Sequence, residues 1–254
     1  MNVLTEKSSS KYLEKMKGWL DVALDEGIHF FVSSLGNPRW IVDRVHPEGG
    51  IVYHDVTERK WAEKAMEAGV DGLIAVNNRA GGHAGSRGPE ALLEELQGFG
   101  VPVICAGGVG DGTAFRGALE MGYEGVQIGT RLIATTESAS PAEYKEAIVD
   151  ADASDIVLTH RITGVPVSVI RTPHVEATGT DAGPITRWLL AQPRTKHLMR
   201  AMLSLRSVMQ LKRAERGGMS HRDFYQAGKS VAGVTEIKSV ADVIEEYVEA
   251  TRPA

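Results

Sequence analysis

The first half of the chain alternates between short apolar runs and longer segments in which apolar residues recur every three or four positions. The short runs predict buried strands at 28–34, 50–56, 72–76, 101–106 and 125–128, with residues 2–4 as the tail of another strand. The longer segments predict helices at 12–26, 37–45, 58–68, 89–96 and 112–121, and Thr57 is the expected N-cap of the third. Strands and helices that alternate at this spacing indicate βαβ units and a parallel sheet.

From residue 140 the pattern changes. It predicts a helix at 141–149, an extended segment at 157–171 and a turn-rich connection at 172–186. Further helices are expected at 185–190, about 195–215 and 240–251. We therefore expect a βα barrel portion at 1–138, which carries the binding loops, and a C-terminal extended and helical cap at 139–254. The basic, methionine-rich stretch at 196–213 is interpreted as part of this cap, or equally as a charged surface with methionines as core filler.

Composition and charge narrow the class of protein. The chain has 254 residues, of which 43% are hydrophobic and 24% are charged, as in folded soluble domains. A net charge of -5 gives no electrostatic support for a nucleic-acid partner, and no apolar run reaches the length of a membrane span. The polar N-terminus lacks the apolar core of a signal peptide, so we expect a cytoplasmic protein. The lone Cys105 excludes an intramolecular disulfide, and no histidine–carboxylate spacing predicts a metal site.

A glycine-rich loop at 77–85 follows the predicted strand at 72–76 and contains His83. It lies at the carboxyl end of a strand, the edge where parallel α/β folds bind ligands. Glycines at Gly81 and Gly82 allow the backbone to approach a flat or charged ligand, and an imidazole exchanges protons near neutral pH. A histidine that only satisfies a turn is the alternative interpretation for His83.

Two more glycine turns follow the next two strands. Gly107 and Gly108 come after the strand at 101–106, and Gly129 and Thr130 come after the strand at 125–128. Successive backbone N–H groups at such turns bind anions, and barrels often hold phosphate after their last strands. These turns therefore favour a phosphate-bearing ligand, with tight strand–helix turns as the simpler alternative.

Three motifs together carry a family resemblance. Ala-Gly-Gly-His-Ala-Gly at 80–85, Ala-Gly-Gly-Val-Gly-Asp-Gly at 106–112 and Val-Gln-Ile-Gly-Thr-Arg at 126–131 resemble, in order and spacing, the motifs of the nitronate monooxygenase family. This family was formerly called 2-nitropropane dioxygenases. The flavin-dependent enoyl-ACP reductases carry almost the same set of motifs. The resemblance extends from about residue 2 to the C-terminal helices and implies a TIM-type (β/α)8 barrel that binds FMN.

The resemblance also implies roles for individual residues. Gly107, Gly108, Gly129 and Thr130 match positions that hold the FMN phosphate, and Gly81 and Gly82 match the loop beside the flavin ring. His83 matches the histidine that binds the substrate or abstracts its proton, which would make it catalytic. Gln226, in a late glycine-containing segment, is a further cofactor contact, with an ordinary loop residue as the alternative. The implied reaction oxidises a nitronate with O2, which yields a carbonyl compound and nitrite.

The chain also departs from the family pattern. The family's opening Pro-Ile-x-Gln-x-x-Met-like strand is absent, so we expect a barrel that lacks its first one or two βα units, with the gap open or filled by a partner subunit in a homo-oligomer. Arg79 stands where many relatives have an acid; its charge favours an anionic substrate, with an ordinary surface residue as the equal alternative. His54 and Asp55 end a strand, where polar residues commonly have no chemical role. Three functions stay open: a nitronate monooxygenase, an enoyl-ACP reductase that uses NAD(P)H, and a non-catalytic barrel or assembly module.

Overall fold

A computed structural model describes residues 1–4, 10–162, 165–181, 183, 188, 192 and 224–252. These residues form two compact units whose segments interleave along the chain. The first unit comprises residues 1–78, 85–106 and 118–127, and the second comprises 79–84, 107–117 and 128–254. The predicted division at residue 138 stays a prediction.

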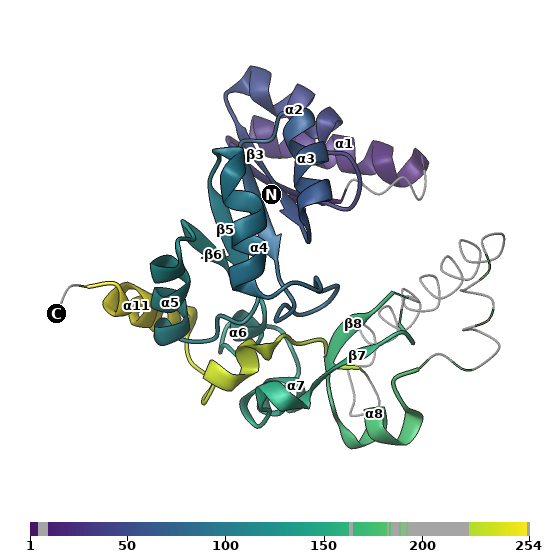
Figure 1. The fold of residues 1–254 in the computed structure, drawn as a ribbon, viewed down its shortest axis with the longest axis vertical. Helices are drawn as coiled ribbons and strands as arrows, with labels where there is room; N and C mark the ends of the chain where they lie inside the picture. Colours follow the sequence, from purple (N-terminus) through teal and green to yellow (C-terminus); the bar gives the residue numbers. More distant parts are fainter. Residues whose placement is uncertain are drawn as a thin grey trace. The chain divides into compact units, whose positions relative to one another are not determined.

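The first unit contains the parallel sheet that the apolar runs predicted (Figure 1). Its six strands lie in sequence order, and each pairs in parallel with the next. The strands are β1 Asn2–Leu4, β2 Phe30–Ser34, β3 Ile51–Val56, β4 Gly72–Val76, β5 Val103–Ala106 and β6 Gly125–Gln127. The fold is an α/β barrel of the TIM type, and the sheet contributes six of its parallel strands within the described residues.

Helices follow the strands of this sheet, as expected for βαβ units. They are α1 Ser10–Asp25, α2 Arg39–Val45, α3 Arg59–Glu67 and α4 Pro89–Leu96, with 3-10 turns at His46–Glu48 and Gln97–Phe99. Helix α4 begins at Pro89, where a missing N–H costs nothing. The expected cap of α3 at Thr57 is wrong, because Glu58 is the N-cap and no side chain caps that helix.

One face of the sheet forms the core of the first unit. Phe31, Val52 and Val56 are almost fully buried and alternate with more exposed neighbours along β2 and β3, whereas Leu73 lies in β4, where residues 72–75 are all buried. Strand register places them in adjacent rows, because Phe31 pairs with Val52 and His54 pairs with Leu73. The period-two pattern thus fixes the buried face of β3, whereas the continuous apolar run of β4 is buried on both faces.

The second unit joins the glycine turns to the C-terminal elements. Its elements are α5 Gly112–Met121 (whose last residues belong to the first unit), α6 Thr130–Ile133, α7 Ala142–Val149, a 3-10 turn at Ala153–Asp155, β7 Ile156–Thr159, β8 Val167–Ile170, α8 Pro173–Thr178, a 3-10 turn at Lys229–Gly233 and α11 Val240–Ala250. Strands β7 and β8 form an antiparallel hairpin, so the extended segment at 157–171 is confirmed as two strands.

The turn-rich connection predicted from residue 172 is partly wrong, because α8 occupies Pro173–Thr178. Thr172 caps this helix by accepting a hydrogen bond from the Val175 N–H at 3.3 Å, and Pro173 fits its first turn. The helices predicted at 185–190 and 195–215 lie outside the described residues. Within the described segments, no helix is long and apolar enough to cross a membrane.

Candidate functional site

The histidine loop at 79–84 belongs to the second unit. Backbone hydrogen bonds from other segments of that unit hold the loop in place. Lys229 donates its N–H to the Arg79 carbonyl at 2.8 Å, and Ser168 donates its N–H to the Gly82 carbonyl at 2.8 Å. His83 itself is exposed at the surface of the loop. The loop backbone is thus fixed on both sides of Gly81 while the imidazole faces outward, an arrangement that leaves the ring accessible to a ligand.

Three segments far apart in sequence meet at Gly228. Its N–H donates to the buried Thr130 hydroxyl at 3.0 Å. A methyl group on Gly228 would lie 2.6 Å from both the Arg79 carbonyl oxygen and the Gly81 nitrogen, closer than side chains approach. Gly228 is therefore required for close approach of backbone to backbone. The predicted residues Gly81 and Thr130 are brought together by this contact, which the sequence did not indicate.

Gln226 lies next to the same loop. It forms an isolated bridge with Val169 of β8, and its side-chain Oε1 lies 3.7 Å from where a Cβ on Gly82 would be. Its backbone carbonyl accepts a hydrogen bond from the Tyr144 hydroxyl, and Tyr144 stacks on Tyr225 with ring centroids 4.6 Å apart. Burial raises the pKa of Tyr144, so this phenol stays a neutral donor. Neither tyrosine was singled out from the sequence.

The edge of β8 aligns the loop with Gln226. Ser168 bridges to Gly82, while Ile170 donates its N–H to the Tyr225 carbonyl at 2.8 Å. Gly82 and Tyr225 therefore both contact the edge of β8 that is not paired with β7. The hairpin therefore sets the register of the histidine loop and the Gln226 segment. A run of alternating Val167 and Val169 could have suggested a strand, but not its partners.

The glycine turn at 107–110 fits an anion that lies against backbone. Gly107 and Gly108 have φ angles of 117° and 85°, which L side chains rarely adopt. Gly129 is exposed, and a Cβ built on it would meet nothing within 4 Å, so the backbone before Thr130 faces open space. Gly107 and Gly108 are only half-buried, and the Arg79 side chain lies against Gly108, where a Cβ would meet its Cδ at 2.8 Å. Glycine turns at the ends of two neighbouring strands, with an arginine beside one of them, suit a phosphate held by backbone N–H groups.

Polar side chains also gather inside the first unit at the ends of β2 to β5. The Ser33 hydroxyl lies 2.8 Å from Nδ1 of the buried His54, and Asn77 donates to the Cys105 sulfur at 3.5 Å. Cys105 is buried. Asp55 has a buried Oδ1 that finds no hydrogen-bond partner in the described structure, and burial raises its pKa to about 7. No group of three or more metal-binding side chains occurs among the described residues.

Burial lowers the pKa of His54 to about 4, which predicts acid-sensitive stability. Between pH 4 and the ordinary value of 6.5, the folded state binds fewer protons on His54 than the unfolded state, so stability falls as pH falls through this window. Between pH 7 and pH 4 we expect the free energy of unfolding to fall by about 3 kcal/mol less in His54→Gln than in the wild type. Urea unfolding of both proteins across this range measures it. Equal slopes for the two proteins would contradict a buried neutral His54.

Fold and site together define an α/β barrel with successive glycine turns at the ends of its strands. The family model described as nitronate monooxygenase matches residues 2–250. The chain therefore belongs to the nitronate monooxygenase family, and the resemblance seen in the three motifs is confirmed.

Individual relatives extend this finding. The chain is 32% identical over 161 residues to (3aS,4S,5R,7aS)-5-hydroxy-7a-methyl-1-oxo-octahydro-1H-indene-4-carboxyl-CoA dehydrogenase of Mycobacterium tuberculosis, which covers 62% of this chain and 45% of that protein. It is 38% identical over 107 residues to the nitronate monooxygenase of Pseudomonas aeruginosa, covering 38% of this chain and 30% of that one. FabK of Thermotoga maritima superimposes with a TM-score of 0.77 at 28% identity, over 98% of this chain and 74% of that chain. The chain spans about half the length of the curated relatives it matches.

Proposed function

We propose that this protein is an FMN-dependent oxidoreductase that oxidises alkyl nitronates with O2 to a carbonyl compound and nitrite, and that it also accepts nitroalkanes. The observation that carries the proposal is the accessible His83 on a loop whose backbone is fixed against Thr130 and Gly228, in a chain that belongs to the nitronate monooxygenase family. The loop brings an imidazole beside a backbone suited to a flat cofactor.

The residues present fit FMN. Gly107, Gly108, Gly129 and Thr130 would hold its phosphate, because Gly107 and Gly108 form a left-handed turn and a Cβ on Gly129 would meet nothing within 4 Å. The Thr130 hydroxyl accepts a hydrogen bond from Gly228 and keeps its own proton to donate to a phosphate oxygen. Gly81, Gly82 and Gln226 would lie beside the ring. When bound, FMN supplies the oxidation of the substrate and the reaction with O2.

His83 would act on the substrate. A neutral nitroalkane loses a proton from the carbon that bears the nitro group before it is oxidised, and an imidazole suits this step because it titrates near neutral pH. A nitronate arrives already deprotonated, so towards it the same imidazole would bind and orient the nitro oxygens. Arg79, at the start of the loop, adds positive charge that favours an anionic substrate.

A second candidate function is reduction of an enoyl thioester with NAD(P)H. It is favoured by the M. tuberculosis relative, whose name identifies a carboxyl-CoA dehydrogenase, and by the likeness to FabK over 98% of this chain. A thioester substrate is also anionic in its carrier, so Arg79 does not choose between the candidates.

Cofactor loading and two assays test the proposal. The purified protein is incubated with FMN, passed through a desalting column and examined for flavin absorbance. Oxygen uptake with propyl nitronate is then compared with NAD(P)H oxidation driven by an enoyl thioester. Flavin retention with nitronate-dependent oxygen uptake is the expected result. Thioester-dependent NAD(P)H oxidation would establish the second candidate, and a protein that retains no flavin would favour the non-catalytic module.

A further inference from the structure

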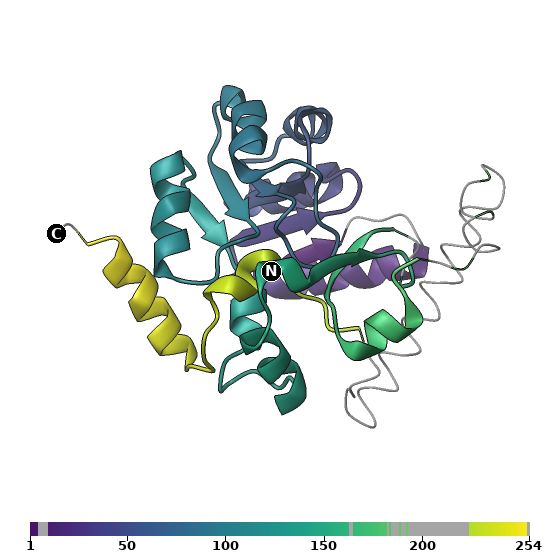
Figure 2. The same ribbon diagram turned by 60° about the horizontal axis from the view of Figure 1, so that its bottom comes forward.

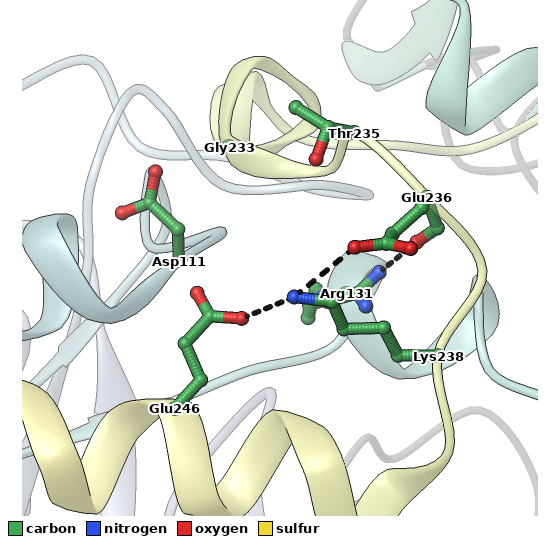
Figure 3. A pocket seen from close by; sticks show the side chains of 7 residues that line it. All are labelled: Asp111, Arg131, Gly233, Thr235, Glu236, Lys238 and Glu246. Atoms are coloured by element: carbon green, nitrogen blue, oxygen red, sulfur yellow. Dashed lines mark hydrogen bonds and ion pairs between the residues drawn. The ribbon is translucent and has the colours of Figure 1, made fainter.

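A polar cavity of about 160 Å³ lies beside the glycine turns of the second unit (Figure 3). It is lined by Asp111, Arg131, Gly233, Thr235, Glu236, Lys238 and Glu246. Figure 3 shows the Lys238 ammonium between the carboxylates of Glu236 and Glu246, at 3.4 Å and 2.9 Å. The cavity wall is therefore a network of ionic hydrogen bonds, and none of its residues belongs to the proposed FMN contacts.

Glu246 links helix α11 to the first glycine turn. Its Oε1 accepts the Gly112 N–H at 2.9 Å, and its Oε2 accepts the Lys238 ammonium. Although burial opposes ionisation, the hydrogen bonds from Lys238 and Gly112 hold the pKa of Glu246 below its usual value. Asp111, the residue before Gly112, accepts the Ala114 N–H at 2.7 Å. Two carboxylates thus satisfy the first N–H groups of α5, directly after the turn at 107–110.

Arg131 links the same network to the second glycine turn. It follows Thr130 and is buried, with 3% of its surface exposed. Its Nη1 donates to the carbonyls of Ala134 at 3.3 Å and Glu236 at 3.1 Å. The segment that carries Glu236 and Lys238 is therefore tied to both turns, to the second through Arg131 and to the first through Glu246.

Helix α11, which carries Glu246, is itself fixed by a capping box and by packing. Ser239 and Asp242 form a capping box at its start, and Val243 is fully buried. Tyr247 stacks on Phe115 of α5, with ring centroids 5.2 Å apart and an angle of 16° between the rings. Figure 1 shows α11 next to α5, and Figure 2 shows the same helix crossing below it at an angle. A carboxylate on this helix can therefore hold the start of α5 in a fixed position.

We propose that α11 acts as a clamp on the two phosphate turns, with Glu246 as its positioning residue. The clamp holds the Gly112 N–H and thereby orders the preceding backbone N–H groups at 107–110, together with those at 129–131, before a phosphate binds, so that less conformational entropy is lost on binding. Glu246 touches neither substrate nor cofactor, and it acts through Gly112 and Lys238. The proposal rests on the proposed FMN site for its ligand, but the Gly112 contact that defines the clamp is independent of it.

Comparison of FMN with riboflavin tests the clamp, because riboflavin has the same ring and lacks the phosphate. Equilibrium dialysis or fluorescence quenching gives both dissociation constants. For Glu246→Ala we expect the preference for FMN over riboflavin to fall about tenfold, the effect of one lost charge-assisted hydrogen bond, while riboflavin affinity stays unchanged. Glu246→Gln keeps an acceptor for Gly112 and loses only the charge, so it should retain most of the preference. Glu245→Ala, an exposed neighbour on the same helix, is the matched control and should behave as the wild type.

Hydrogen exchange at the Gly112 amide provides a readout without flavin. The clamp predicts faster exchange of this amide in Glu246→Ala than in Glu245→Ala, with unchanged exchange in the β4 core. Equal loss of FMN and riboflavin affinity would overturn the clamp, since it would indicate general unfolding. If the wild type shows no preference for FMN over riboflavin, the proposed cofactor site fails. Hydrogen exchange at the Gly112 amide then tests the clamp by itself. Unchanged exchange in Glu246→Ala overturns the clamp, and faster exchange supports it.

Discussion

Replacing His83 by alanine should lower kcat/KM for a neutral nitroalkane by about 10²- to 10⁴-fold, the usual contribution of a positioned general base. The loss should be smaller with a preformed nitronate, because its proton has already been removed. This contrast separates proton abstraction from binding, since loss of a purely binding residue would affect both substrates alike. Oxygen uptake with nitroethane and with ethyl nitronate, each over a range of concentrations, measures it.

Two variants make the His83 result specific. His83→Gln keeps a hydrogen-bonding side chain but cannot take up a proton at neutral pH, so it should recover activity with the nitronate more than with the nitroalkane. His29 is an exposed histidine directly before β2. The control variant His29→Ala should leave both activities unchanged. Flavin content must match that of the wild type in every variant. Unchanged nitroalkane turnover in His83→Ala would refute the catalytic role.

Replacing Asp55 by asparagine should stabilise the protein at pH 8 by about 4 kcal/mol and change little at pH 4. The carboxyl has a buried Oδ1 without a hydrogen-bond partner in the described structure, and burial raises its pKa from 3.8 to about 7. Between these two values, the folded state binds more protons at Asp55 than the unfolded state. Its contribution to stability is therefore present below pH 3.8 and is lost as pH rises through about 7.

Urea unfolding of wild type and Asp55→Asn at pH 4, 6 and 8 measures this difference. The slopes from Asp55 and His54 have opposite signs between pH 4 and 6.5, so each hides the other in the wild type. Asp55→Asn should therefore expose the acid sensitivity of His54, and His54→Gln should expose the alkaline sensitivity of Asp55. If the unfolding free energies of the wild type and Asp55→Asn differ by the same amount at all three pH values, Asp55 does not titrate in this range.

Local sequence pattern accounts for much of the first unit. The strands at β2 to β6 and the helices between them follow from apolar periodicity and from glycines that end each element. The motifs around His83, Gly108 and Thr130 also follow from the sequence, because glycine turns at strand ends have a characteristic composition. The error at Thr57 concerns a helix start, where a cap depends on backbone geometry that several residue types can provide. At α8 a short helix was missed, because Thr172 and Pro173 are residues that begin helices as well as form turns.

The sequence by itself determined the α/β class, the succession of strands and helices along the first half of the chain and the residues of the glycine turns, since these depend on neighbours along the chain. Tertiary structure alone decided which distant segments meet. It placed Gly228 against Gly81 and Thr130, paired Gln226 with β8, and joined Glu246 to Gly112 across the chain. It also decided that the Asp55 Oδ1 is buried without a hydrogen-bond partner in the described structure, because the cost of burying a charge depends on what surrounds it in space.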